Sequence, residues 1–357
     1  MPHRKWSETR AFLAIALCGF PAAACFGGES TADSVVAGAA EQLDRRLEES
    51  GFSGAFLIAQ RGEIVLARGY GYADAAKERE ITPTTAFWTA SVAKNFTAAA
   101  VLHLVDAGKI TLDQPVTRYL EGLPADWNTM TIHHVLSHSS GIGQKYAADR
   151  KDDRHRALAA IAALPLADPP GAGWRYSNDG FSLLAMLVEV VSGRSYEDYL
   201  ADELFAAAGL DNTGFWARPP QGALAELPGM ERRIGKSDWG RRGATGIASS
   251  VEDLYKWWQA LSSGRIVSAE SVDRMLSPQA DVRSGLTVGY GWFQEATTAG
   301  EPVLWTRGTD ESGENAIVLV LPERAVVIVG ASHVNEEAGK DPPTRRWAWE
   351  VVETLSR

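Results

Sequence analysis

The chain has 357 residues, of which 45% are hydrophobic and 22% are charged, and its formal net charge at pH 7 is −10. This composition is typical of a globular protein, and the length allows one large domain or two interleaved ones. An acidic chain without a basic run repels phosphate backbones, so nucleic acid is excluded as an expected partner.

Residues 1–24 have the features of a secretory signal peptide. Arg4, Lys5 and Arg10 form a basic start, residues 11–20 are almost all apolar, and three alanines precede Cys25. The apolar run is shorter than the ~18 to 20 residues that span a bilayer. We therefore expect an exported protein, either periplasmic or anchored to a membrane as a lipoprotein.

Cys25 is the residue on which a lipid anchor would depend. The run Ala-Ala-Ala-Cys resembles a lipoprotein processing site, in which Cys25 becomes the acylated N-terminus. The alternative is plain cleavage near Ala24, with Cys25 incidental. The other cysteine, Cys18, lies inside the signal segment, so the body of the protein has no disulfide framework, Cys-ligated metal or thiol nucleophile.

The elements that follow the signal begin with a helix and a hairpin. Residues 25–36 are small and polar and are typical of a tether, whereas residues 37–49 have helical spacing. Two strand-like runs, 53–60 and 63–70, are separated by a two-residue Arg-Gly turn, which predicts an antiparallel hairpin.

The middle of the chain is helical in pattern. Residues 98–107 are apolar on nearly every face, which predicts a buried helix that ends at Gly108. Residues 181–191 and 251–261 predict two further helices, the last one capped by Ser249 or Ser250.

Strand signals return near the C-terminus and precede a last helix. The predicted strands are 286–293, 302–306, 316–321 and 325–331, and the predicted helix is 345–355. Strands at both ends with helices between them predict an α/β (α+β) fold, in which a sheet built from both termini receives a helical insertion. We assign residues 37–90 and 275–357 to the sheet domain and 91–274 to the mainly helical domain.

Ser91 and Lys94 form the first candidate catalytic pair. Residues i and i+3 lie on one face of a helix, so the hydroxyl and the amine can meet. Ser91 is the only serine in the chain with Lys three residues later. A lysine can take the serine proton when burial lowers its pKa. The alternative is that Ser91 caps the helix and Lys94 is solvated.

Tyr176 and Asn178 form the only Tyr-x-Asn in the chain, in a turn-rich approach to a predicted helix. A tyrosine near a cationic lysine has a lowered phenol pKa and can relay the serine proton to the leaving group. Asn178 can orient Lys94 and donate to a substrate carbonyl. The alternative is a tyrosine packed on the core with Asn178 in a turn.

These two motifs, about 80 residues apart, resemble those of the class C β-lactamases, their penicillin-binding relatives and the class VIII carboxylesterases. Flanking segments of the chain are also similar to that family: Leu112-Asp113-Gln114-Pro115-Val116, Leu136-Ser137-His138-Ser139-Ser140-Gly141-Ile142, Thr245-Gly246 and Val288-Gly289-Tyr290-Gly291-Trp292. The resemblance runs from about residue 50 to the end.

The resemblance implies a fold and a set of catalytic residues. The fold would be an antiparallel sheet flanked by N- and C-terminal helices, with a helical domain across the cleft (β-lactamase/transpeptidase-like). Ser91 would be the nucleophile, assisted by Lys94 and Tyr176, while the similar segment around His138 is structural in the family. We expect no metal and no cofactor, because the histidines lack metal-ligand spacing and no Gly-rich phosphate loop is present.

The third family motif is where this sequence departs. The family has Lys-Thr-Gly or His-x-Gly on a strand, whereas the segment here reads Leu304-Trp305-Thr306-Arg307-Gly308-Thr309. Trp305 or Thr306 therefore stands where the cation is expected, similar to the Trp-Gly-Gly of class VIII esterases. Arg307 shares a strand face with Trp305 and either supplies the missing charge or narrows the cleft. We predict substrate contacts from Asn178, Trp305, Arg307 and Gly308.

The leading functional hypothesis is a serine hydrolase that forms an acyl-enzyme on Ser91 with a small-molecule ester, amide or peptide substrate. An esterase ranks first, because the cation that holds carboxylate-bearing substrates is missing. A D,D-peptidase, a D-amino-acid peptidase or a weak β-lactamase is the alternative within the class. The alternative of another class is a non-catalytic, penicillin-sensor-like binding protein.

Overall fold

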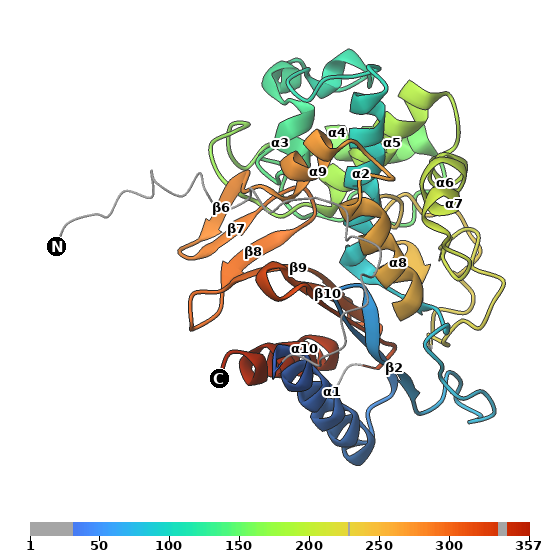
Figure 1. The fold of residues 1–357 in the computed structure, drawn as a ribbon. Coiled ribbons are helices and arrows are strands. Elements are labelled where there is room, and N and C mark those ends of the chain that lie inside the picture. Colours follow the sequence, from blue (N-terminus) through green and yellow to red (C-terminus); the bar gives the residue numbers. More distant parts are fainter. Residues whose placement is uncertain (1–30, 228, 335–340) are drawn as a thin grey trace.

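The computed structural model describes residues 31–227, 229–334 and 341–357 (Figure 1). The predicted signal peptide and Cys25 lie outside these residues. Among the residues described, no helix combines the length and the apolar character needed to cross a membrane.

Eight of the described strands form one antiparallel sheet, in the order β2-β1-β11-β10-β9-β8-β7-β6. Its strands are β1 (Gly54–Gln60), β2 (Glu63–Tyr70), β6 (Ala280–Arg283), β7 (Leu286–Val288), β8 (Phe293–Ala296), β9 (Pro302–Thr309), β10 (Asn315–Leu321) and β11 (Val326–Ser332). β1 pairs with β11 along its whole length, from Gly54 opposite Ser332 to Gln60 opposite Val326. The prediction of a sheet built from both ends of the chain is confirmed.

A second, smaller sheet has the order β3-β5-β4, with β3 (Phe87–Trp88), β4 (Gly214–Phe215) and β5 (Ile247–Ser249). The helices are α1 (Thr31–Ser50), α2 (Ala93–Asp106), α3 (Ile132–Leu136), α4 (Arg154–Ala162), α5 (Asn178–Ser192), α6 (Tyr196–Tyr199), α7 (Ala206–Ala208), α8 (Val251–Ser262), α9 (Ala269–Leu276) and α10 (Pro343–Leu355). A short 3-10 helix, η2 (Ala90–Val92), leads directly into α2.

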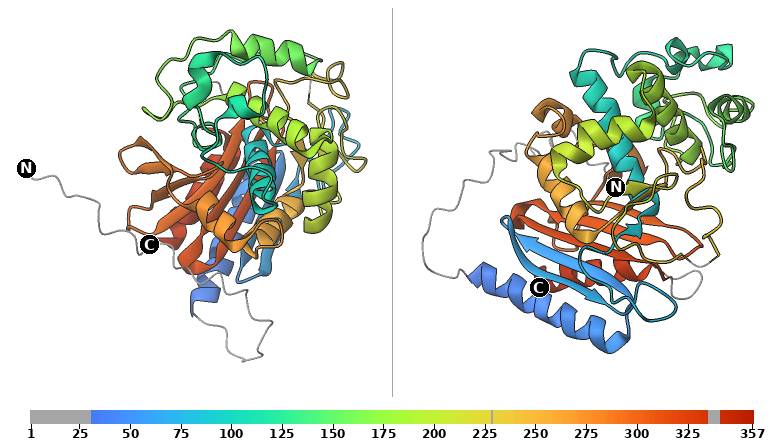
Figure 2. Two further views of the ribbon diagram at one scale, coloured as in Figure 1. Left: turned by 90° about the horizontal axis from the view of Figure 1, so that it is seen from above. Right: turned by 90° about the vertical axis from the view of Figure 1, so that its right-hand side faces the viewer.

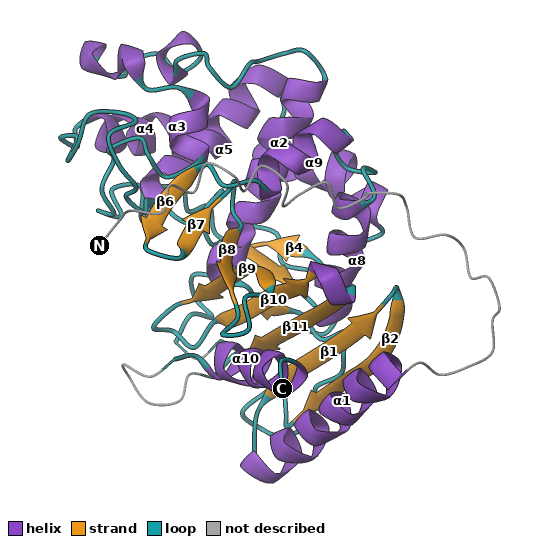
Figure 3. Cartoon of the chain, turned by 60° about the vertical axis from the view of Figure 1, so that its left-hand side comes forward, coloured by secondary structure: helices purple, strands orange, loops and turns teal. Residues whose placement is uncertain are grey.

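Helices cover both faces of the main sheet. α1 and α10 pack on one face and α8 packs on the other, against β1 and β11 (Figures 2 and 3). Along β1, Phe56 and Ile58 therefore face α1 and α10, while Ala55 and Leu57 belong to the core beneath the inserted helices. A strand with helices on both sides is buried on both faces. β1, β10 and β11 are accordingly buried at every position and are apolar except at their end residues Gln60, Asn315 and Ser332.

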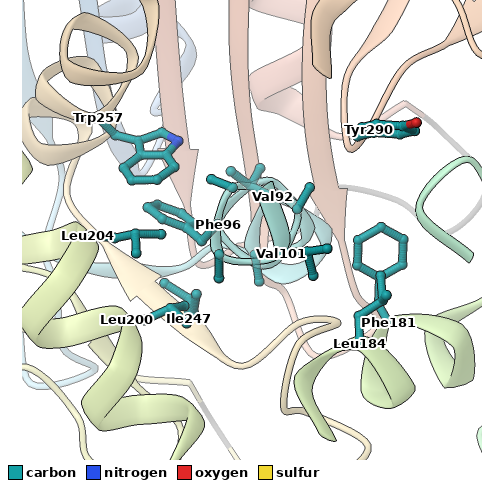
Figure 4. Close-up of a cluster of buried hydrophobic side chains, with 14 of the residues drawn as sticks. Val92, Phe96, Val101, Phe181, Leu184, Leu200, Leu204, Ile247, Trp257 and Tyr290 are labelled. Carbon is teal, nitrogen blue, oxygen red and sulfur yellow. The ribbon is translucent and has the colours of Figure 1, made fainter. Parts of the chain in front are cut away.

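Helix α2 is the buried axis of the inserted helices. Val92, just before it, and Phe96 and Val101 on it contact residues from several elements, including Phe181 on α5 and Trp257 on α8 (Figure 4). The prediction of a buried helix is confirmed, and the helix extends to the first catalytic candidates at its N-terminal end.

Three predicted boundaries differ from the structure. α1 begins at Thr31, inside the predicted tether, because Val36 is buried in the cluster beneath α1 and α10. α8 belongs to the inserted segment in sequence, yet it packs on the sheet, so the division at residue 274 separates it from the layer that it covers. The predicted strand 286–293 is interrupted by a turn in which Gly291 has a φ of +79° and approaches Asn95 of α2.

Candidate active site

Ser91 lies in η2 at the point where the chain enters α2. Lys94 is on the first turn of α2, and its Nζ donates to the Ser91 Oγ at 3.1 Å. The preceding residue, Ala90, has a φ of +46°, a conformation that non-glycine residues rarely adopt. The predicted meeting of the hydroxyl and the amine is thus present in the structure.

Tyr176 reaches the same oxygen from the loop before α5. Its hydroxyl donates to the Ser91 Oγ at 2.6 Å. The loop is held by Ser177, whose Oγ caps α5 by accepting from the Gly180 N–H at 3.0 Å. Two proton-carrying groups from separate elements therefore converge on one serine oxygen.

Burial sets the protonation state of Lys94. Its side chain is 2% exposed, and burial lowers the pKa of Lys94 well below its usual range. Among the described residues no carboxylate forms an ion pair with it, and its Nζ donates instead to the Ala244 carbonyl at 2.8 Å. Burial thereby favours the neutral amine, which can accept a proton.

The expected pKa shift of Tyr176 is wrong in direction. The sequence predicts a phenol pKa lowered by a cationic Lys94, whereas burial raises the pKa of Tyr176 above its usual value. The hydrogen bond to Ser91 and the charge of Arg307 oppose this rise but are weaker than burial. Tyr176 therefore keeps its proton in the resting site, and Lys94 is the better placed base.

His138 packs against the ring of Tyr176. The two rings stack with their centroids 4.5 Å apart and their planes at 27°. The His138 Nδ1 accepts from the backbone N–H of Ser177 at 3.1 Å. Burial, with a smaller effect of Lys94, lowers the pKa of His138 to about 3, so the imidazole is neutral. These contacts fit the structural role that the resemblance implies.

Asn178 lines the cleft but does not hold Lys94. It is the first residue of α5 and is 8% exposed, and its Oδ1 has no hydrogen-bond partner among the described residues. The Ala244 carbonyl takes the role predicted for Asn178. The loop that carries Ala244 is fixed to α2 by Thr97, whose hydroxyl donates to the Gly243 carbonyl at 2.8 Å. The sequence cannot identify a backbone carbonyl as the acceptor, because any residue type provides one. The Thr245-Gly246 motif of the family does indicate the loop to which Ala244 belongs.

Gly308 on β9 lies directly against Ser91. A Cβ at this position would come within 2.4 Å of the Ser91 backbone nitrogen and 2.1 Å of the Thr89 carbonyl oxygen. Only glycine allows this approach of the strand to η2. Because alternate residues of a strand share a face, Thr306 points to the same side as Gly308. Thr306, not Trp305, thus stands where the family cation is expected.

Trp305 and Arg307 lie on the other face of β9. The Trp305 ring stacks on Phe293 with centroids 4.5 Å apart, and the Arg307 guanidinium lies 5.8 Å from the Trp305 ring. Arg307 still lines the cleft, because the pairing of β8 with β9 ends at Phe293 opposite Trp305. No hydrogen bond or ion pair joins Arg307 to another residue in the described parts of the chain.

These groups line a cleft of about 450 Å³, a volume typical of small-molecule sites. The residues that line it include Ser91, Lys94, Tyr176 and Asn178. Further lining residues are Gln144, Tyr146, Asp149, Trp174, Arg233, Arg241, Val282, Leu286, Phe293 and Asp310. All seven site residues predicted within the described chain, including Trp305, Arg307 and Gly308, therefore lie at or against this cleft.

An ion pair that sequence reasoning missed fixes one side of the cleft. The Arg241 Nη1 donates to both carboxylate oxygens of Glu314, at 3.1 Å each, and the Glu314 side chain is fully buried. Arg241 precedes the Ala244 loop, and Glu314 lies in the hairpin that follows β9. The pair therefore joins the loop that holds Lys94 to the strand that contacts Ser91.

Glu314→Ala is expected to lower the free energy of unfolding by up to about 3–5 kcal/mol, because it leaves the buried Arg241 guanidinium with only the longer contact to Asp310, at 3.8 Å. Urea denaturation would measure this loss. The matched control is the double variant Arg241→Met/Glu314→Leu, which removes both charges and should be closer to wild type. A Glu314→Ala protein as stable as wild type would contradict the assigned role of the pair.

Comparison with known proteins places this geometry in context. The family model described as Beta-lactamase matches residues 39–353. PbpX of Bacillus subtilis (strain 168) is 30% identical over 267 residues, which is 71% of this chain and 65% of that protein. Penicillin-binding protein 4* of the same organism is 27% identical over 272 residues, 69% of this chain and 60% of that protein. The match thus spans less than two thirds of either relative.

Solved structures show the same fold. A penicillin-binding protein from Bacillus halodurans has a TM-score of 0.73 at 24% identity, covering 88% of this chain and 98% of its own. The octameric penicillin-binding protein homologue from Pyrococcus abyssi has a TM-score of 0.75 at 24% identity, covering 89% of this chain and 77% of its own. The predicted antiparallel sheet with flanking helices is confirmed.

Proposed function

Since the chain belongs to the β-lactamase family of serine hydrolases, we propose that it hydrolyses esters of small molecules through an acyl-enzyme on Ser91. One observation carries the proposal. The Ser91 Oγ lies 3.1 Å from the amine of a buried lysine and 2.6 Å from a tyrosine hydroxyl. This is the arrangement of an activated nucleophile, with a base and a proton donor on one oxygen.

Acylation begins with proton transfer from Ser91 to Lys94. Burial favours the neutral amine, so Lys94 can accept the hydroxyl proton as the Oγ attacks the substrate carbonyl carbon. The carbonyl oxygen becomes an oxyanion, which the Ser91 N–H and an N–H of β9 just after Arg307 would stabilise. The close approach of Gly308 to Ser91 supports this position for the oxyanion.

The leaving group departs with a proton from Tyr176. As the bond between the carbonyl carbon and the leaving oxygen breaks, the Tyr176 hydroxyl donates to that oxygen, and Lys94 returns a proton to Tyr176. Tyr176 acts as a relay rather than a stable phenolate, because burial raises its pKa. Water then attacks the acyl-enzyme, with Lys94 again as base, and releases the acid and free Ser91.

Esters rank before β-lactams and peptides because Thr306, and not a cation, shares the Ser91 face of β9. The names of the relatives and the cation of Arg307 in the cleft support a second candidate, a D,D-peptidase, D-amino-acid peptidase or weak β-lactamase. A penicillin-sensor-like protein that acylates without turnover is the alternative from another class. The intact set of Ser91, Lys94 and Tyr176 argues against it.

A substrate panel tests the proposal. We expect short p-nitrophenyl esters to be turned over faster than nitrocefin and D-Ala-D-Ala peptides. A burst of one equivalent of p-nitrophenol without further turnover would instead identify a binding protein. Efficient nitrocefin hydrolysis with negligible ester turnover would reverse the ranking of substrates and leave the serine mechanism intact.

Arg307→Ala is expected to separate charged from neutral substrates. The partly buried guanidinium is available to a substrate carboxylate, and one charge-assisted hydrogen bond contributes roughly 1.5–3 kcal/mol, or about 10- to 150-fold. The kcat/KM of carboxylate-bearing esters should fall by that factor, while neutral esters keep theirs. Arg307→Lys, which retains the charge, is the matched control. An equal effect on both substrate types would mean that Arg307 does not bind the substrate charge.

A further inference from the structure

Three aromatic side chains form a continuous surface that starts beside Tyr176. The Trp174 ring lies 6.3 Å from the Tyr176 ring and 6.5 Å from Phe293, which stacks on Trp305 at 4.5 Å with an interplanar angle of 13°. We call Trp174, Phe293 and Trp305 the aromatic wall. Its members come from the loop before α5, from β8 and from β9, so the fold brings together residues that are far apart in sequence.

The wall is apolar and open to the cleft. Trp174 and Phe293 are partly exposed, whereas Trp305 is 6% exposed and supports Phe293 from behind. The Trp305 Nε1 donates to the Glu295 Oε1 at 2.9 Å, and the Trp174 Nε1, which has no hydrogen-bond partner among the described residues, is itself buried. The aliphatic side chains of Val282 and Leu286 line the same part of the cleft. A flat apolar group laid here would be removed from water and would contact ring faces and edges.

The other lining residues contrast with the wall in chemistry. Asp149, Arg233, Arg241 and Asp310 line the cleft as a charged group. Both arginines form ion pairs. Arg241 lies 3.1 Å from Glu314 and 3.8 Å from Asp310. Arg233 lies 2.9 Å from Asp238. The cleft therefore offers two chemically different surfaces to the two parts of a substrate.

Tyr176 decides which part of the substrate meets the wall. The leaving oxygen must come within hydrogen-bond distance of the Tyr176 hydroxyl, which protonates it. The group attached to that oxygen must then extend past Tyr176, and the wall begins at the ring next to it. The acyl group stays bound to Ser91. The carbonyl oxygen of that acyl group would lie against β9 at Gly308.

We propose that the aromatic wall is the leaving-group subsite and that it binds a ring-sized apolar alcohol portion of the substrate. The inference rests on the proposed ester hydrolysis at Ser91. In the step concerned, the Ser91 Oγ forms the new ester bond, the bond to the alcohol oxygen breaks, and the alcohol leaves from the wall with the proton of Tyr176.

Two esters with the same acyl group test the subsite. Benzyl acetate and ethyl acetate release alcohols of similar acidity and give the same acetyl-enzyme, so they differ in the ring alone. Wild type should prefer benzyl acetate in kcat/KM. Phe293→Ala should lower the benzyl-to-ethyl ratio about 10-fold, which is the size expected for the loss of a ring contact together with apolar area. The deacylation rate constant should be unchanged.

Three comparisons keep the result specific. Phe293→Leu, which remains apolar, should retain part of the preference, and Trp174→Leu is a second variant should Phe293→Ala fold poorly. Tyr72→Ala, which removes an exposed aromatic side chain outside the cleft, should leave the ratio unchanged. The preference for ethyl phenylacetate over ethyl acetate, in which the ring is on the acyl side, should also be unaffected by Phe293→Ala.

The inference is overturned if wild type has no preference for the benzyl ester, or if Phe293→Ala lowers turnover of the phenylacetyl ester instead. In the second case the wall binds the acyl group, and deacylation would change as well. Failure of the proposed function has a different signature: neither acetate is turned over and a fluorophosphonate probe does not label Ser91.

Discussion

Ser91→Ala is expected to lower kcat for ester hydrolysis by about 10³-fold or more. The substitution removes the oxygen that both Lys94 and Tyr176 contact, so the base has no proton to accept and the nucleophile is lost. Steady-state turnover of a p-nitrophenyl ester measures the loss, and far-UV circular dichroism establishes that the variant is folded.

Covalent labelling gives a second readout for Ser91. A fluorophosphonate probe should label the wild type and should leave Ser91→Ala unlabelled. Ser195→Ala is a suitable control, because Ser195 is an exposed residue that caps the short helix α6. Labelling of another residue, or full activity in Ser91→Ala, would contradict the assignment of Ser91 as the nucleophile.

Lys94→Ala and Tyr176→Phe are each expected to lower kcat by about 10²- to 10⁴-fold, the range found for general acid–base groups. Because the proposed mechanism passes one proton between the two side chains, the double variant should be little worse than the more damaging single variant. A clean multiplication of the two losses would mean independent roles.

The pH profile and a charge-preserving variant identify the base. The neutral form of Lys94 accepts the proton, so kcat/KM should rise with pH as Lys94 loses its proton, at a pH well below 10.5. This limb should vanish in Lys94→Ala. Lys94→Arg retains a cation that cannot be deprotonated in a protein, so it should remain inactive. Recovery of activity in Lys94→Arg would show that a positive charge, and not a base, is required.

The parts of the site that sequence predicts well are the local ones. The spacing of Ser91 and Lys94 follows from the helical repeat alone, and the apolar run after them predicts a buried helix. Tyr176 lies 85 residues from Ser91 in the chain, so only the resemblance to a family associates the two. Its raised pKa could not be predicted, because it depends on how deeply the folded chain buries the phenol.

Contacts to the backbone are the main gap. The Ala244 carbonyl that holds Lys94 could belong to any residue type, so no sequence pattern marks it. Sequence does not determine which face of β9 Thr306 occupies, for a related reason: alternation gives the relative direction of neighbouring side chains but not the absolute one. The contact of Gly308 with Ser91 supplies the missing reference. The turn that divides β7 from β8 likewise depends on a tertiary contact, between Gly291 and Asn95.

The pairing of β1 with β11 has a consequence for the order in which the protein folds. About 270 residues separate these strands in the chain, and closing so long a loop is entropically costly and slows folding. During synthesis β1 has only β2 as a neighbour in the sheet until β11 emerges, so the pairing at the centre of the sheet cannot form early. Such a chain keeps apolar strand edges exposed until β11 has been made, which favours capture by chaperones before the sheet is complete.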